Sequence, residues 1–185
     1  MIGDPFESVL AAAQSGAEWA FAVLYRELNH RLLRYFAAQA PAEAEDLASE
    51  TWLLAARQLR GFAGDETSFR AWLFTIARRR LVQHWRDCGR RPARGAGADG
   101  LDALPGRADV EQSVVDADAA HGTVRLLCEV LSPDQADVVL LRVLGGLDVE
   151  QVAAILHKRP GTVRVLQHKA LRRLAEKFPD GALTL

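Results

Sequence analysis

Hydrophobic residues recur every three or four positions along most of the chain, which is the spacing of one face of an α-helix. In the first half this spacing predicts four helices, at about residues 4–14, 18–38, 41–59 and 69–86. In the second half it predicts four more, at about residues 110–131, 133–144, 148–156 and 160–174. We see no alternation of the kind expected for strands and no internal repeat. The pattern therefore predicts an all-α fold.

Polar residues that cap helix ends support these boundaries. Ser132 and Asp148 each precede a hydrophobic stretch, and each is followed three residues later by a glutamine, Gln135 and Gln151. This is the capping-box arrangement of a helix N-terminus. Pro160 stands where a first helical residue needs no N–H group. Asp4, with Glu7 three residues later and Pro5 at the first helical position, predicts a third helix start of this kind.

A change of composition divides the chain. From Gly89 to Ala108 the sequence is rich in Gly, Ala, Pro and Arg and has no helical period. A stretch of this length and composition is typical of a linker between domains. We therefore predict a four-helix module at residues 1–88, a flexible linker at 89–109 and a second helical module at 110–185.

The last two predicted helices carry the strongest functional signal. A short helix, the Lys158-Arg159 turn and a longer helix follow one another. One side of the longer helix is apolar, with Val163, Leu166, Ala170 and Leu174. The opposite side presents Gly161, Val165, His168 and Arg172, flanked by Arg164 and Lys169. A supporting helix, a turn and a helix with a cationic outer face form the geometry that enters a DNA major groove.

A solvated face is the ordinary explanation for exposed charge on a single helix. Residues 157–177, however, contain seven Lys or Arg residues and a single acid, Glu176. An ordinary exposed helix mixes the two signs, so that neighbours four residues apart can pair. One-signed charge suits contacts with phosphates, each of which releases counterions. The charge distribution therefore favours DNA binding.

Charge is distributed unevenly along the 185 residues, although the net charge is only −1. Residues 78–94 hold seven arginines and one acid, whereas residues 99–150 hold eleven acids and three arginines. Two basic blocks around an acidic middle predict two DNA-facing surfaces. The sequence shows neither a bilayer-spanning apolar run nor a signal peptide, so we expect no membrane insertion and a cytoplasmic location. Cys88 and Cys128 are then expected to be plain thiols.

The basic block at residues 78–94 begins in the fourth predicted helix. Its arginines are interleaved with Gln83, His84 and Trp85, a mixture that can follow a backbone and stack an unpaired base. The preceding loop carries polar groups that could read a base taken out of the stack. Trp72 shares a helix face with apolar residues and is expected in the core, whereas Trp85 is equally compatible with core packing and base stacking.

Three segments together resemble sigma factors of the extracytoplasmic-function (ECF) type, which are members of the sigma-70 family with only two domains. Residues 46–53 resemble its polymerase-binding helix, residues 69–78 the segment that melts and reads the −10 element, and residues 131–164 the domain that reads the −35 element. The resemblance covers nearly the whole chain in the family's order. It implies a protein that binds core RNA polymerase and recognises promoter DNA.

The resemblance also implies roles for particular residues. The polymerase β′ clamp helices would bind Asp46, Ser49, Glu50, Trp52 and Leu53. The −10 element and the separated strand would bind Phe62, Asp65, Glu66, Arg79, Arg80, Gln83, Trp85 and Arg86. The −35 element would bind Arg159, Thr162, Arg164, Val165, His168, Lys169 and Arg172. The polymerase β flap and an anti-sigma factor are further expected partners.

Some positions depart from the family's pattern. An arginine, Arg79 or Arg80, stands where asparagine is common, and Gln83 stands where aspartate is common. Val165-Leu166 replaces a Ser-Arg pair. An outward valine can meet a thymine methyl but offers no hydrogen bond. These departures bear on which promoter sequence is read.

Catalytic and metal-binding alternatives find little support. The acidic face of the third helix has no accompanying Glu-x-x-His pair, which a di-iron site would need. His84 and Cys88 could offer two zinc ligands, but no second pair has ligand spacing. We therefore expect no enzymatic activity, no cofactor and no metal. The remaining rivals are a free-standing helix-turn-helix regulator and a protein-interaction module without DNA contacts.

Overall fold

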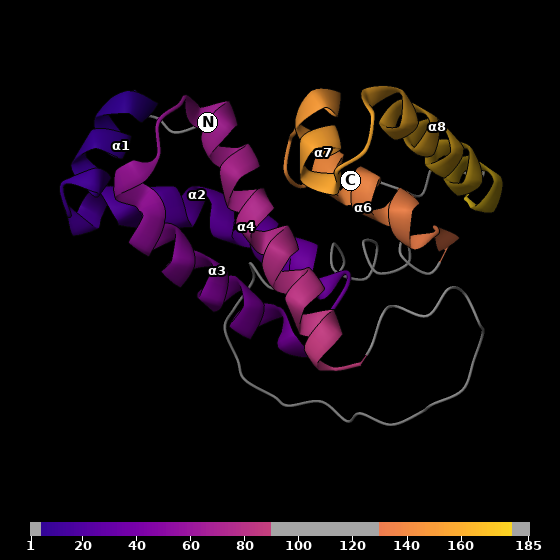
Figure 1. The fold of residues 1–185 in the computed structure, drawn as a ribbon, viewed down its shortest axis with the longest axis horizontal. Coiled ribbons are helices and arrows are strands. Elements are labelled where there is room, and N and C mark those ends of the chain that lie inside the picture. The colour runs from indigo at the N-terminus through magenta and orange to yellow at the C-terminus, as the bar shows by residue number, and fades with distance from the viewer. Residues whose placement is uncertain (1–4, 90–129, 179–185) are drawn as a thin grey trace.

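The computed structural model describes residues 5–89 and 130–178 (Figure 1). The first range contains four α-helices, α1 (Phe6–Gln14), α2 (Glu18–Ala37), α3 (Ala44–Gln58) and α4 (Glu66–Asp87). The second range contains α6 (Pro133–Val143), α7 (Val149–Leu156) and α8 (Pro160–Lys177). Two 3₁₀ turns, Pro41–Glu43 and Leu59–Gly61, flank α3. The helix predicted over residues 110–131 and the linker lie almost wholly outside the described residues.

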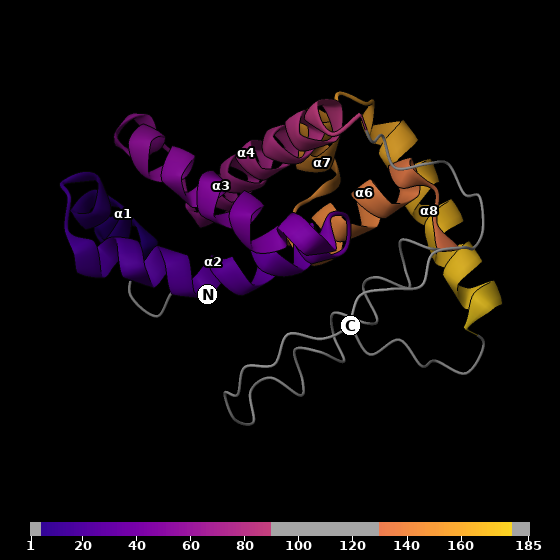
Figure 2. The same ribbon diagram turned by 90° about the horizontal axis from the view of Figure 1, so that it is seen from below.

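The N-terminal module packs α2, α3 and α4 against one another, with α1 across one end (Figures 1 and 2). Tyr35 contacts the rings of Phe36 and Phe74 with centroids 5.5 Å apart in both pairs. The largest fully buried side chains of this module are Tyr35, Phe36, Phe69, Phe74, Leu24, Leu32, Leu73 and Leu81. The hydrophobic stripes predicted from sequence thus form its core.

Helix α4 begins three residues earlier than the sequence predicts. Asp65 is its N-cap, and the Asp65 side chain accepts a hydrogen bond from the Ser68 N–H at 2.7 Å. The first turn of α4, from Glu66 to Ser68, is polar. A polar first turn has no hydrophobic period, so the pattern could not reveal it and the expected loop is shorter than predicted.

The C-terminal module shows both predicted capping boxes. Ser132 caps α6 and Asp148 caps α7, and in each case Oε1 of the glutamine three residues later accepts a hydrogen bond from the backbone N–H of the cap residue. Asp4, the third predicted cap, lies outside the described residues. Helix α7 ends at His157, whose φ of 52° is left-handed and is the only positive φ of a non-glycine residue in the described ranges. This sharp exit sends the chain into α8, where Pro160 occupies the first helical turn as predicted.

The two modules pack against each other rather than lying apart. Helix α4 contacts α7, and Figures 1 and 2 both place α7 between α4 and α8. One continuous cluster of buried side chains runs from the N-terminal module into α6, α7 and the start of α8, where it includes Leu141, Leu147, Val152 and Val163. The sequence predicts two modules joined by a flexible linker and gives no sign of this contact.

Candidate nucleic-acid and polymerase interfaces

The helix-turn-helix has the predicted division between an inner and an outer face of α8. Val163, Ala170 and Leu174 are buried and Leu166 is half-buried. The residues predicted to face DNA are all exposed: Arg159, Thr162, Arg164, Val165, His168, Lys169 and Arg172. Val165 exposes 53% of its surface, which leaves its methyl groups free to contact a partner.

Two of the arginines on this outer face take part in surface ion pairs. Arg164 Nη2 lies 2.8 Å from Glu150 Oε1 on α7, and Arg172 Nε lies 2.9 Å from Glu176 Oε1 one turn along α8. All four side chains are more than half exposed. Exposed pairs of this kind contribute between about 0 and 1 kcal/mol, so a phosphate can replace either carboxylate at little cost.

The outer face of α4 is more strongly engaged by the protein itself. Arg79 and Arg86 are exposed, but Arg80 donates two hydrogen bonds to the Glu50 carboxylate on α3. Gln83 Nε2 donates to Asp87 Oδ1 at 2.7 Å. Helices α3 and α4 are therefore joined through residues that the family resemblance assigns to two different partners.

Trp85 packs rather than projecting. It is half-buried against the core, and the guanidinium carbon of Arg78 lies 5.1 Å from the centroid of its ring. An arginine over an aromatic face is a favourable cation–π contact and occupies the surface on which a base would stack. In this arrangement the structure favours the packing alternative for Trp85.

The loop before α4 is fixed by ring contacts with α4 and by hydrogen bonds from α1. The Phe62 ring contacts Phe69 and Trp72, with centroids 5.4 and 5.1 Å away. Gln14 Nε2, at the end of α1, donates to the carbonyl oxygens of Leu59 and Phe62 at 3.0 and 2.7 Å. Trp72 packs against the core as predicted. Nothing in the local pattern around Gln14 signals this contact, which spans more than 40 residues.

The acidic residues near this loop differ in exposure. Asp65 is exposed, and hydrogen bonds from Ser68, side chain and backbone, lower the pKa of its carboxyl group. Glu66 is half-buried in the first turn of α4. The negative charge of Asp65 thus serves the N-terminus of α4, where a carboxylate is favourable.

The outer face of α3 presents the predicted polymerase-binding residues with one correction. Asp46, Ser49 and Glu50 are exposed, and Leu53 exposes 53% of its surface. Trp52 is only 4% exposed. At roughly 100° per residue, Trp52 lies on the same side of α3 as Ala48 and Ala55, which are buried, and away from Asp46 and Glu50, so its ring is not available to a partner in this arrangement.

Trp52 instead fastens α3 to α2. Its Nε1 donates to Asn29 Oδ1 at 3.0 Å, and its ring contacts Phe21 and Tyr25 at centroid distances of 5.7 and 5.2 Å. Tyr25 is 42% exposed beside it. Trp52 therefore positions the outer face of α3 and supports an exposed tyrosine that neighbours it.

A shallow hollow of about 250 Å³ lies where α3 meets the end of α4. Its lining is mostly acidic and polar, with Glu43, Asp46, Leu47, Glu50, Arg80, Gln83, His84 and Asp87. His84 Nε2 is 3.8 Å from Glu43 Oε2, and Cys88 Sγ is 3.8 Å from His84 Nδ1. Within residues 5–89 and 130–178, His, Cys, Asp and Glu side chains form no group of three or more placed to hold a metal ion.

One long-range ion pair has no counterpart in the sequence pattern. Arg78 Nη2 on α4 lies 2.6 Å from Asp137 Oδ2 on α6, and the two residues are 59 positions apart. The Asp137 side chain is 5% exposed. The sequence does not single Asp137 out, because α6 also carries Asp134, Gln135 and Arg142, and it does not indicate the partner.

Family models and related proteins agree with this arrangement. The model described as Sigma-70 region 2 matches residues 21–91, and that described as Sigma-70, region 4 matches residues 122–174. The fold and its helix-turn-helix thus define a two-region protein of the sigma-70 class. Among curated relatives, the ECF RNA polymerase sigma factor SigD of Mycobacterium tuberculosis is 30% identical over 188 residues, 96% of this chain and 86% of the relative. The chain belongs to the ECF family of RNA polymerase sigma factors.

A second relative is longer than this chain. The ECF RNA polymerase sigma factor BldN of Streptomyces coelicolor is 35% identical over 172 residues, which are 92% of this chain and 64% of BldN. The match therefore spans slightly less than two thirds of that relative. Among the described residues, no helix has the length and apolar character needed to cross a membrane.

Solved structures share the fold. CnrH in complex with the cytosolic domain of CnrY matches with a TM-score of 0.62 and 20% identity, covering 97% of this chain and all of CnrH. The sigma factor RpoE in complex with the anti-sigma factor NepR from Bartonella quintana matches with a TM-score of 0.63 and 23% identity, covering 87% of this chain and 98% of RpoE. These likenesses confirm the predicted all-α fold.

Proposed function

We propose that this chain binds core RNA polymerase and directs it to promoters that carry −10 and −35 elements. The observation that most supports the proposal is the combination of cationic outer faces on α4 and α8 with an acidic and apolar outer face on α3. A regulator that acts on duplex DNA alone needs only the α8 face. The chain itself supplies recognition and no catalysis, and its place of action is the cytoplasm.

The outer face of α8 reads the −35 element. Arg164 and Lys169 supply hydrogen-bond donors and positive charge toward base edges and phosphates. Val165 contacts thymine methyl groups, since it lacks a polar group. The other contacts come from Arg159, Thr162, His168 and Arg172.

The outer face of α4 and its preceding loop bind the −10 element. Arg79 and Arg86 are exposed and follow the phosphates of the separated strand. Arg80 and Gln83 join them once they leave Glu50 and Asp87. Phe62, Asp65 and Glu66 shape the site for an unstacked base. Trp85 contributes indirectly, because its ring supports Arg78.

The outer face of α3 docks on the β′ clamp helices of the polymerase. Leu53 is the apolar anchor, with Asp46, Ser49 and Glu50 around it as a polar rim. Trp52 contributes by holding α3 in place. The β flap is a second contact, made by the C-terminal module.

An anti-sigma factor is the expected regulator. RpoE of Bartonella quintana has been solved with one, as its description states. Three large apolar side chains of the N-terminal module, Trp19, Tyr25 and Leu53, expose between 42% and 57% of their surfaces. These side chains offer apolar surface that an anti-sigma factor could cover.

Run-off transcription with purified core polymerase and a genomic promoter library tests the proposal. Specific transcripts should appear only when the chain is added, and their upstream sequences should share two elements. Leu53→Asp should abolish polymerase binding, whereas Val143→Asp, which alters an apolar residue with 43% exposure on α6, should retain it. Duplex binding without polymerase binding and without transcripts would support the free-standing regulator instead.

A further inference from the structure

Three arginines from three helices meet around one glycine. Arg31 lies on α2, Arg70 on α4 and Arg142 near the end of α6, and Gly146 stands in the turn between α6 and α7. A Cβ atom at Gly146 would lie 3.5 Å from Nη1 of Arg31 and 3.5 Å from Nη1 of Arg70. Arg142 Nη1 donates a hydrogen bond to the carbonyl oxygen of the next residue, Leu147. We call Arg31, Arg70 and Arg142 the arginine cluster.

The positive charges of the arginine cluster have no carboxylate beside them. Within residues 5–89 and 130–178, ion pairs engage other basic residues and none of these three. Arg70 has a neutral partner, the Thr67 hydroxyl, which accepts a hydrogen bond from its Nη2 at 3.3 Å. Since Nη1 of Arg31 and Nη1 of Arg70 are each 3.5 Å from one point, they lie within about 7 Å of each other. Like charges this close repel, and a bound anion would remove the repulsion.

Hydrogen-bond donors of the arginine cluster also remain unused. Nε of Arg70 and Nε of Arg142 are buried and have no acceptor in the described part of the chain. The same holds for Nε of Arg34, which lies one turn along α2 from Arg31. Buried donors nearly always have a partner, whether protein, water or ion, because an unpaired donor has lost its hydration without compensation. An acceptor is therefore missing at this place.

The arginine cluster is accessible at Gly146, which is exposed, whereas the three arginines are half-buried. Gly146 has a left-handed φ of +60°, and its missing side chain leaves the space between two guanidinium groups open. The outer face of α8 is different, because Arg164 and Arg172 are 60% and 75% exposed along one helix and suit an extended DNA backbone. Donors that converge on one point from separate helices suit a compact anion.

We propose that the arginine cluster binds a polyphosphate group, either free or carried by a nucleotide. Guanidinium groups form bidentate, charge-assisted hydrogen bonds with phosphate oxygens, and planar donors from several directions can surround a tetrahedral phosphate. Three unpaired positive charges match a di- or triphosphate better than a monophosphate. Binding at this site requires neither promoter nor polymerase, so the inference is independent of the proposed function.

Isothermal titration calorimetry of the full chain with sodium tripolyphosphate, at fixed ionic strength, tests the site. We expect one saturable site per chain. Arg31→Gln and Arg70→Gln should each weaken binding by about tenfold or more, because each removes charge-assisted hydrogen bonds. Arg26→Gln is the matched control, since Arg26 is exposed on the same helix as Arg31 and the charge change is the same. It should change the affinity by less than about twofold, because exposed charges are screened.

Gly146→Asp should remove the site while keeping all three arginines. Aspartate tolerates the left-handed conformation better than most residues do. Its carboxylate would occupy the space between Arg31 and Arg70 and pair with them in place of the anion. Tripolyphosphate binding should therefore be lost in this variant, with circular dichroism showing that it and the arginine variants are folded. Binding as tight as that of the parent chain would show that the anion lies elsewhere.

His30 on α2 reports whether the site is occupied. Burial, and after it the positive charge of Arg31, lowers the pKa of the His30 imidazole, while Arg34 adds to this effect and Glu27 opposes it. An anion held by Arg31 offsets that charge, so saturating tripolyphosphate should raise the pKa of His30 in an NMR titration. The rise should be absent in Arg31→Gln. A purely structural role of Arg31 would leave the pKa of His30 unchanged by the anion.

Tripolyphosphate and nucleoside triphosphates distinguish the two sources of the anion. Equal or weaker binding of nucleotides indicates a site for the polyphosphate alone, and tighter binding of one nucleotide indicates a nucleotide site, so either result supports the proposal. Absence of saturable binding, or equal losses for Arg26→Gln and Arg31→Gln, would overturn it. So would DNA binding that depends on Arg31 in a chain that does not bind tripolyphosphate, which would assign the arginine cluster to the DNA backbone.

Discussion

Helices α4 and α8, the two that we propose bind DNA, differ in how far their side chains are engaged by contacts within the protein. Helix α4 buries six residues along its length, whereas α8 buries three. On the polar side, Arg78 and Arg80 of α4 bind carboxylates on other helices, and one of these is buried. The outer face of α8 is engaged only by exposed pairs. In the proposed function, the outer face of α8 can contact duplex DNA as it stands, whereas Arg80 of α4 must leave Glu50 before it can contact the separated strand.

This difference suits the two tasks. Reading a duplex major groove requires a rigid helix whose side chains are already free. Holding a separated strand is useful only after polymerase has engaged the promoter, so basic residues that stay occupied until then limit unproductive contacts. In the proposed function, arginines on two helices would thus serve two roles because their neighbours differ.

The largest expected effect concerns stability. Phe74→Ala on α4 removes a fully buried ring that contacts Tyr35, and should lower the free energy of unfolding by about 3–5 kcal/mol. Val165→Ala on α8, an exposed position, should change it by less than about 0.5 kcal/mol. Urea denaturation followed by circular dichroism measures both. Equal losses at the two positions would show that α8 is as deeply integrated as α4.

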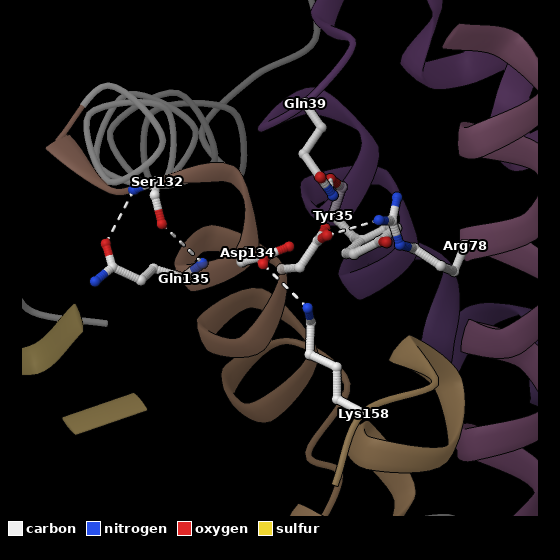
Figure 3. A network of polar contacts seen from close by, with 8 residues as sticks. Tyr35, Gln39, Arg78, Ser132, Asp134, Gln135 and Lys158 are labelled. Carbon is white, nitrogen blue, oxygen red and sulfur yellow. Dashed lines mark hydrogen bonds and ion pairs between the residues drawn. The ribbon is translucent and has the colours of Figure 1, made fainter. Parts of the chain in front are cut away.

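The buried carboxyl group of Asp137 should give the protein an unusual pH response. Burial, only partly offset by Arg78, raises the pKa of Asp137 from 3.8 to about 6. The groups around it are Arg78 from α4, Asp134 from its own helix and Lys158 from the turn after α7, with Tyr35 of α2 nearby (Figure 3). Below pH 3.8 the carboxyl is protonated in both states. Between that pH and about 6 the unfolded state loses its proton first, so stability falls as pH rises.

Asp137→Asn isolates this contribution because asparagine does not titrate. Between about pH 4 and pH 6 the free energy of unfolding of the parent chain should fall relative to that of Asp137→Asn by up to about 3 kcal/mol. Other carboxyl groups cancel in the difference. Chemical denaturation of both chains at several pH values measures it. A difference that grows in the opposite direction would mean that the Arg78 charge outweighs burial.

On α8, the exposed outer face predicts losses in DNA affinity without losses in stability. Arg164→Ala should weaken binding of the holoenzyme to its promoter by about 1–3 kcal/mol, roughly 5- to 150-fold, and relax the preference at one −35 position. Lys177→Ala, at the end of the same helix, should act weakly and uniformly across sequences. Filter-binding titrations at fixed salt distinguish the two. A sequence-independent loss for Arg164→Ala would reassign it to phosphate contact.

Local patterns predicted the parts of the molecule that are determined locally. The apolar stripe of α8 and the caps at Ser132 and Asp148 follow from residues three or four positions apart, and each is confirmed. The helical spacing of α3 would also have predicted that Trp52 is buried, because it lies on the same face as Ala48 and Ala55, which are buried. Its assignment to the polymerase surface came from the family resemblance, which does not distinguish a residue that makes a contact from one that supports it.

The contact between the two modules through Arg78 and Asp137 could not be predicted from such patterns. Asp137 follows the capping box of α6 closely enough to be taken for an exposed first-turn acid, and its partner Arg78 belongs to a basic run that looks solvated. The pair exists only because two modules meet across a long intervening segment. Tertiary contacts between elements far apart in sequence carry no periodic signal, and they decide which of several similar arginines is buried.

The smallest expected effect tests the exchange of partners on α4 directly. Glu50→Gln removes the carboxylate that engages Arg80 while keeping its shape, and should strengthen binding of the isolated chain to single-stranded −10 oligonucleotides by up to about 1 kcal/mol, or about fivefold. Glu176→Gln, which frees Arg172 on α8, is the matched control and should leave that affinity unchanged. Fluorescence anisotropy at low salt is sensitive enough for both. If the two variants behave alike, the Glu50–Arg80 pair merely adds to general surface charge, and the contrast between an occupied α4 and a ready α8 rests on Arg78 alone.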